Sequence, residues 1–172
     1  MSEIHQKHFE EYSLKIRVGQ GFDVHPFCDN KILKLGGIEI QHPLGLRGHS
    51  DGDVLLHAIA DAIFGAIGLQ DIGHHFPPGL PETLNIDSRI ILHKVRDELN
   101  RYGWTICNID STIICEKPKI APYRDKMSDC IALCLGIAAE QVQVKATTTE
   151  KLGFTGRGEG IAALATCLVT KE

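Results

Sequence analysis

The order of strand-like and helix-like segments is the feature that most constrains the fold of this chain. Apolar and polar residues alternate over residues 14–22, which is typical of a strand, and Gly36-Gly37 separates two short strand-like segments, residues 32–35 and 38–40. Further strands are predicted over residues 104–115, 141–147 and 160–169, and helices over residues 50–68, 88–102 and 122–135. Because these segments are mixed without strict βαβ repetition, we predict a two-layer α+β domain with its helices on one face of the sheet.

The predicted helices carry their own start and stop signals. Ser50 is the expected N-cap of the first helix, with Asp51 and Asp53 in its first turn, where negative charge suits the helix dipole. Ser88 is the expected N-cap of the second helix, and Gly103 is its expected stop.

Length and composition indicate one globular domain and exclude several classes of protein. The chain has 172 residues, of which 43% are hydrophobic, and its 18 basic against 22 acidic residues give a net charge of −4. That charge disfavours a nucleic-acid partner, and no apolar run is long enough to span a bilayer. The first residues lack the apolar core of a signal peptide, so we predict a cytoplasmic protein whose six cysteines stay reduced. Residues 1–14 are predicted to be a polar extension, and residues 15–172 a single domain.

A possible metal site is the first chemical signal in the sequence. Asp23 and His25 are two residues apart beside a predicted strand, so they project to the same side and could grip a single ion. His57, on the first predicted helix, could supply a third ligand. Three protein ligands with an open fourth position are typical of a catalytic zinc site, although such residues also occur as ordinary core or surface polar groups.

A polar stripe on the first predicted helix allows two interpretations. Asp53, His57 and Asp61 are spaced four apart and therefore share one helix face. The stripe could be a set of surface ion pairs, or it could be a metal ligand that a neighbouring acid such as Asp61 orients.

Three further segments could handle phosphate. His49-Ser50 lies where the first helix is expected to start, and helix starts bind anions, although simple capping by Ser50 is an equal interpretation. Residues 145–160 combine three consecutive threonines with Glu150 and several glycines, as in loops that bind phosphate and magnesium, but a threonine-rich strand end and a flexible turn would look the same. Lys117-Pro118-Lys119 could meet a diphosphate or be a solvated loop.

Four motifs occur in one order along the chain: Gly21-Phe22-Asp23-Val24-His25, then His49-Ser50-Asp51-Gly52-Asp53-Val54 with His57, then Asp71-Ile72-Gly73 with Phe76-Pro77, and finally KATTTEKLGFTGRGEG over residues 145–160. Together they resemble the 2-C-methyl-D-erythritol 2,4-cyclodiphosphate synthase family, from about Lys15 to the C-terminus. The last motif is very specific.

The resemblance implies an activity, an assembly and a fold. Members of this family are phosphorus–oxygen lyases of the non-mevalonate route to isoprenoids: the 2-phosphate of a CDP-linked methylerythritol attacks the β-phosphorus, and CMP leaves. They are homotrimers with active sites between subunits, and isoprenoid diphosphates are proposed to bind in a central cavity near the residues that match Arg157 and Glu159. The implied fold is an α+β sandwich with a ferredoxin-like βαβ arrangement and a mixed sheet.

The resemblance also implies roles for individual residues. Asp23, His25 and His57 would bind zinc, and Glu150 would bind a second divalent cation, magnesium or manganese. His49 and Thr148 would steady the transferring phosphate. The residues implied in substrate binding are Ser50, Asp71, Ile72, Gly73, Phe76, Cys115, Lys119, Ile120, Ala121, Ala146, Thr147, Thr149, Phe154 and Arg157.

Two departures from the family pattern and two alternatives accompany this interpretation. Residues 78–82 read Pro-Gly-Leu-Pro-Glu where the family usually has an acid that touches the substrate hydroxyls, so backbone groups or Glu82 would have to replace it, and Gln20 stands where the family often has histidine. The alternative functions are a zinc-dependent phosphodiesterase that uses water and a non-catalytic trimeric module that binds nucleotides or isoprenoid diphosphates.

Overall fold

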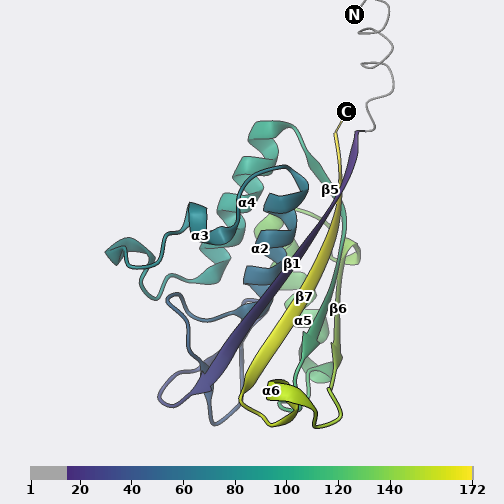
Figure 1. Ribbon diagram of the computed structural model, residues 1–172. Helices are drawn as coiled ribbons and strands as arrows, with labels where there is room; N and C mark the ends of the chain where they lie inside the picture. Colours follow the sequence, from purple (N-terminus) through teal and green to yellow (C-terminus); the bar gives the residue numbers. More distant parts are fainter. Residues whose placement is uncertain (1–14, 172) are drawn as a thin grey trace, which may run out of the picture.

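A computed structural model describes residues 15–171, so the predicted extension of residues 1–14 lies outside the described residues. The main sheet has five strands in the order β4-β1-β7-β5-β6 (Figure 1). β1 (Ile16–Cys28) pairs antiparallel with β7 (Gly160–Thr170), β7 pairs antiparallel with β5 (Thr105–Ile114), and β5 pairs parallel with β6 (Val142–Thr147). The mixed sheet with helices on one face confirms the predicted α+β fold.

Smaller elements complete the domain. β2 (Leu33–Leu35) and β3 (Ile38–Ile40) form the expected hairpin around Gly36-Gly37, and β4 (Gly45–Leu46) pairs with the end of β1. The helices are α2 (Val54–Ala66), α3 (Ile72–His75), α4 (Ser88–Tyr102), α5 (Arg124–Leu135) and α6 (Gly153–Gly156), with short 3-10 turns η1 (Pro81–Thr83), η2 (Ala121–Tyr123) and η3 (Ala139–Gln141). No helix among residues 15–171 combines the length and the apolar character that a bilayer crossing requires.

Close packing of α2 on β1 brings the two metal-site elements together. A Cβ atom on Gly19 would lie 1.8 Å from the backbone oxygen of Ala62, and one on Gly21 would lie 2.0 Å from that of Ala58. Glycine is therefore required at both positions of β1, because any side chain would push the helix away. The helix contributes a nearly continuous buried surface, so it is the centre of the core.

The opposite face of the sheet carries exposed apolar side chains on β1. Val18 is 66% exposed, Phe22 57% and Ile16 50%. Figure 1 shows the helices α2 and α4 gathered on the other face. Three large apolar side chains exposed on one face of a strand are typical of a binding or assembly surface.

Several boundaries differ from the sequence predictions. Ser50 is not the N-cap of α2: Asp53 is, and its carboxylate accepts a hydrogen bond from the Leu56 amide. Ser88 is not the N-cap of α4 either, because Asp87 caps the helix through the Arg89 amide. β1 continues to Cys28, since β7 pairs with it as far as Pro26 and Gly160.

Other predicted signals are confirmed. Gly103 ends α4 and Gly136 ends α5, both in the left-handed conformation that favours glycine. The six cysteines are all free thiols, as expected, and three are fully buried: Cys115, Cys134 and Cys167.

Candidate functional site

Three side chains from two elements converge on one point, as the sequence predicted. Asp23 and His25 are two positions apart on β1, so both side chains point to the same side of the strand, toward α2. His57 faces them from the first turn of that helix. His57 Nδ1 lies 2.9 Å and His25 Nε2 3.0 Å from Asp23 Oδ2, and the two ring nitrogens are 3.1 Å apart. Two imidazoles and a carboxylate are a ligand set for a divalent cation such as zinc, and they leave a fourth position of a tetrahedral shell open.

The electrostatics of this group keep Asp23 ionised. Burial by itself raises the pKa of Asp23, but the hydrogen bonds and charges of His25 and His57 outweigh it and hold the pKa well below its usual range. Burial lowers the pKa of His25, and the Asp23 carboxylate more than reverses that effect, so the net direction is upward. An ionised carboxylate therefore lies between the two rings.

The outer nitrogen of His25 is fixed by the backbone. His25 Nδ1 lies 2.7 Å from the carbonyl oxygen of Arg47. A carbonyl can only accept a hydrogen bond, so Nδ1 carries a proton and the lone pair of the neutral ring is on Nε2, which faces Asp23 and His57. This second contact is the usual support of a metal-binding histidine, and it fits a divalent cation at this position.

A cavity of about 230 Å³ opens from the three ligands. It contains several residues that the sequence predicted for substrate binding: His49, Ser50, Ile72, Gly73 and Phe76. Asp71 caps α3 by accepting a hydrogen bond from the His74 amide, and so fixes the turn that carries Ile72 and Gly73. Four lining residues were not predicted from the sequence: Pro78, Thr83, Ile86 and Ile91.

The segment of residues 78–82, which departs from the family pattern, contacts the cavity residue His49. His49 Nε2 lies 3.0 Å from Thr83 Oγ1 and accepts a hydrogen bond from the Gly79 amide at 3.3 Å. Pro78 lines the cavity, whereas Glu82 is exposed and is not among its described lining residues. Of the two replacements considered for the missing family acid, the described geometry favours backbone groups over Glu82.

Asp61 contacts the backbone of a residue that lines the cavity and not the ring of His57. Its Oδ1 accepts a hydrogen bond of 2.7 Å from the Ile72 amide, which ties α3 to α2. The His57 ring is instead contacted by the hydroxyls of Ser50 and Ser88, each 3.0 Å from Nε2. The predicted role of Asp61 in orienting His57 therefore has no matching hydrogen bond among the described residues.

A second cluster surrounds Glu150. Thr148 Oγ1 donates a hydrogen bond of 2.7 Å to Glu150 Oε1. Glu150 and Lys151 have φ values of 52° and 64°, in the left-handed region that is costly for residues other than glycine. Glu116 supports this conformation, because its Oε1 accepts hydrogen bonds from the amides of Thr149 and Lys151 at 3.2 and 3.1 Å. No pattern in the sequence predicted this role for Glu116.

The residues predicted for nucleotide binding also lie together. Cys115 continues β5, and its amide donates a hydrogen bond of 3.1 Å to the Thr147 carbonyl at the end of β6. Ala146 and Thr147 are exposed beside it, and Lys119, Ile120 and Ala121 follow in the next loop. Burial raises the pKa of the Cys115 thiol to about 11, so this cysteine is not a thiolate nucleophile at neutral pH.

The glycine-rich end of this region carries the remaining predicted residues. Arg157 and Glu159 form an exposed ion pair of 2.7 Å, and Phe154 is partly exposed on α6. Thr149 Oγ1 lies 3.0 Å from the Thr155 hydroxyl of the same helix. Among the described residues, the metal cavity is lined only by residues between positions 23 and 91, so within one chain it contains none of the predicted residues after position 114.

The fold and the site define an α+β sandwich protein with an Asp-His-His group for a divalent cation at the base of a cavity, and a separate loop cluster of hydroxyls, glycines and Glu150. The chain belongs to the YgbB family, which it matches over residues 16–170.

Relatives and solved structures agree with this membership. The 2-C-methyl-D-erythritol 2,4-cyclodiphosphate synthase of Thiobacillus denitrificans is 54% identical over 91% of this chain and 98% of its own length, and that of Prosthecochloris aestuarii is 55% identical over 91% and 100%. The bifunctional IspDF of Campylobacter jejuni superposes with a TM-score of 0.89 at 41% identity over 93% of this chain, which spans 43% of that longer protein. IspF of Plasmodium falciparum in complex with CDP gives 0.80 at 36% identity, over 91% and 97% of the two chains.

Proposed function

We propose that this chain is a 2-C-methyl-D-erythritol 2,4-cyclodiphosphate synthase, a phosphorus–oxygen lyase of non-mevalonate isoprenoid biosynthesis. It converts 4-diphosphocytidyl-2-C-methyl-D-erythritol 2-phosphate to the 2,4-cyclodiphosphate and CMP. Membership of the YgbB family and relatives above 50% identity along nearly the whole chain support this activity. The observation that carries it is the convergence of Asp23, His25 and His57 at the base of a cavity.

The reaction asks for charge neutralisation and alignment rather than a general base. The 2-phosphate is already ionised near neutral pH, so it needs no deprotonation before it attacks the β-phosphorus. Asp23, His25 and His57 would hold zinc, and Glu150 a magnesium or manganese ion; when bound, these cations neutralise the two phosphates. His49 and the Thr148 hydroxyl steady the transferring phosphate, and Lys119 adds positive charge at the diphosphate.

The two ends of the substrate bind to the two groups of residues described above. Ser50, Ile72, Gly73 and Phe76, with Asp71 behind them, take the methylerythritol phosphate beside the metal ligands. The residues proposed for the cytidine diphosphate, including the loop and α6 residues near them, are Cys115, Lys119, Ile120, Ala121, Ala146, Thr147, Thr149, Phe154 and Arg157. Within this group Ile120 and Cys115 are buried, whereas Lys119, Ala146 and Thr147 are exposed.

The active form is a cytoplasmic homotrimer with its sites between subunits. Two observations support this assembly: the metal cavity of one chain contains none of the proposed nucleotide residues, and the sheet face opposite the helices exposes Ile16, Val18 and Phe22. The exposed Arg157–Glu159 pair would then lie near the central cavity, where an isoprenoid diphosphate could bind.

Phosphorus NMR of the purified protein with its CDP-linked substrate tests the activity. The expected products are CMP and a cyclic diphosphate in equal amounts. An open-chain diphosphate formed with water would indicate the alternative zinc-dependent phosphodiesterase. Substrate that is bound but unchanged would indicate the non-catalytic binding module.

Two inactive variants should restore activity to each other if the sites are shared. His57→Ala removes a zinc ligand, and Lys119→Ala weakens the nucleotide half of the site. In a randomly mixed trimer about one interface in four pairs two intact halves, so co-expression should give roughly a quarter of wild-type activity. The measurement is CMP release by the whole co-expressed population and by mixed trimers isolated through two affinity tags; the isolated trimers exclude both homotrimers, so about one interface in three is intact and roughly a third of wild-type activity is expected of them.

The control for this experiment is each variant expressed alone, which must be severely impaired. Mixed trimers no more active than these parents would exclude sites shared between subunits.

A further inference from the structure

The outer nitrogen of His57 lies in an enclosed hydroxyl environment. Nε2 is 3.0 Å from Ser88 Oγ and 3.0 Å from Ser50 Oγ, while Nδ1 on the other side of the ring faces Asp23. The His57 side chain is 9% exposed and Ser88 is fully buried. The proton positions in this group therefore depend on protein partners rather than on bulk water.

The single hydroxyl proton of Ser88 is committed to Asp51. Ser88 Oγ lies 2.5 Å from Asp51 Oδ1, and the Ser88 amide donates to Oδ2 of the same carboxylate at 3.2 Å. An ionised carboxylate can only accept, so Ser88 must donate its proton to Asp51. Its oxygen can then only accept from His57, which requires a proton on Nε2. Nδ1, which lies 2.9 Å from the Asp23 carboxylate, is then the nitrogen left for a cation, which takes the place of any proton held there.

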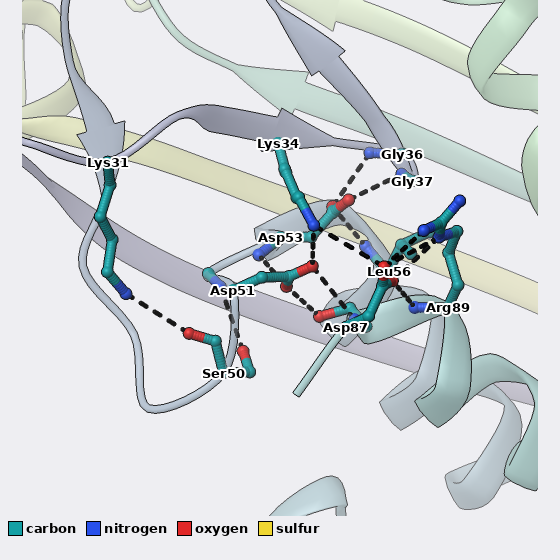
Figure 2. A network of polar contacts seen from close by, with 12 residues as sticks. Lys31, Lys34, Gly36, Gly37, Ser50, Asp51, Asp53, Leu56, Asp87 and Arg89 are labelled. Atoms are coloured by element: carbon teal, nitrogen blue, oxygen red, sulfur yellow. Dashed lines mark hydrogen bonds and ion pairs between the residues drawn. The ribbon is translucent and has the colours of Figure 1, made fainter. Parts of the chain in front are cut away.

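A charged network holds Asp51 in place (Figure 2). Lys34 Nζ lies 3.5 Å from Asp51 Oδ2 and 3.7 Å from Asp87 Oδ2, between the two carboxylates. Lys34 belongs to β2, and the turn that follows it donates the Gly36 and Gly37 amides to Asp53, the N-cap of α2. The β2–β3 hairpin thus fixes both the start of the helix that carries His57 and the acid behind Ser88.

We propose that Asp51 and Ser88 are positioning residues that set the tautomer and the orientation of the His57 ring, so that Nδ1 presents its lone pair to the metal. This inference rests on the proposed function, in which His57 is a zinc ligand. Neither residue touches the metal position; each acts through His57, as groups behind metal-binding histidines commonly do.

The variant Asp51→Asn distinguishes this role from simple packing. The Ser88 amide is a fixed donor, so the new side chain must turn its oxygen toward that amide and its NH2 group toward Ser88 Oγ. The described contacts that change are the weak one from the Asp53 amide at 3.3 Å, which is lost, and the pair with Lys34 at 3.5 Å, which loses its charge on the Asp51 side. Ser88 would now accept from Asn and donate to His57 Nε2, which moves the ring proton to Nδ1, where it blocks the metal.

Two measurements read this change. The first is nitrogen-15 NMR of histidine-labelled, metal-free protein, which reports the tautomer of each ring. The second is zinc affinity by competition with a chromophoric chelator. We expect Nε2 of His57 to carry a proton in the wild type and to carry none in Asp51→Asn, where Ser88 donates to it. We expect zinc affinity to fall about 10- to 100-fold in Asp51→Asn and in Ser88→Ala.

Ser111→Ala is the matched control, since Ser111 is equally buried but donates to the Gln143 carbonyl on β6. It should keep wild-type tautomer and affinity. If Asp51→Asn folds with Nε2–H retained and both variants bind zinc like the wild type, the inference is wrong. Should Ser88→Ala fail to fold, the near-isosteric Asp51→Asn still decides the question. If His57→Ala binds zinc as tightly as wild type, the proposed metal site itself fails.

Discussion

Purified His57→Ala should contain almost no zinc and should release no measurable CMP from the CDP-linked substrate. The substitution removes one of three converging ligands, and the two that stay, Asp23 and His25, cannot complete a tetrahedral shell. Loss of a group that only supports a ligand costs 10- to 100-fold in metal affinity, so loss of the ligand itself should cost more than about 100-fold. Elemental analysis after extensive dialysis, beside a turnover assay, measures both effects.

His93→Ala is the matched control for this variant. His93 lies on α4 and its Nδ1 contacts the Cys134 carbonyl at 3.1 Å, away from the metal cavity. It should keep one zinc ion per chain and normal turnover. Full zinc occupancy in His57→Ala would show that the Asp23-His25-His57 group is not the zinc site.

This metal group could be predicted because its signals are local. Asp23 and His25 share one side of an extended segment by simple alternation, and the strand and helix that carry the three ligands follow from apolar patterns. The convergence of His57 on the pair depends on close packing between α2 and β1, which the sequence expresses only as Gly19 and Gly21. Without knowledge of the helix–strand contact, those glycines look like breaks in a strand.

The N-cap of α2 was predicted wrongly because the contacts that favour Asp53 over Ser50 come from a turn far away in the sequence. Ser50 is a good N-cap by propensity, but the Asp53 carboxylate also accepts hydrogen bonds from the amides of Gly36 and Gly37 in the distant β2–β3 turn. These contacts fix its carboxylate at the first turn of α2 and make it the better cap. Serine is then free to contact the His57 ring.

Residues that support the site from behind had no local signal at all. Ser88 was predicted only as a cap, and no role was predicted for Glu116, yet each acts across more than 30 positions of sequence. Ile86 and Ile91, for which no role was predicted either, line the cavity. Such roles depend on tertiary contacts, which residue type and spacing do not encode one position at a time.

The second large effect is expected for Glu150→Gln, a substitution that changes the charge of the side chain and little else. Glu150→Gln keeps a side-chain oxygen that can accept the hydrogen bond of the Thr148 hydroxyl, and Glu116 continues to hold the backbone through the amides of Thr149 and Lys151. The left-handed conformation at positions 150 and 151 is therefore retained. What is lost is the negative charge that, under the proposed function, would hold a magnesium or manganese ion.

Turnover of Glu150→Gln should consequently fall by about 100-fold or more, while zinc content and thermal unfolding stay at wild-type values. Initial rates of CMP release across a magnesium titration measure the effect, and the variant should need far more magnesium than the wild type to reach any given rate. Glu140→Gln, an exposed acid on η3, is the matched control and should behave as wild type. Near-normal turnover of Glu150→Gln at limiting magnesium would contradict a metal-binding role. The proposed reaction brings two anionic phosphates together, so its rate depends strongly on neutralisation of their charge. The loss of one carboxylate that holds a cation should therefore lower the rate without affecting the fold.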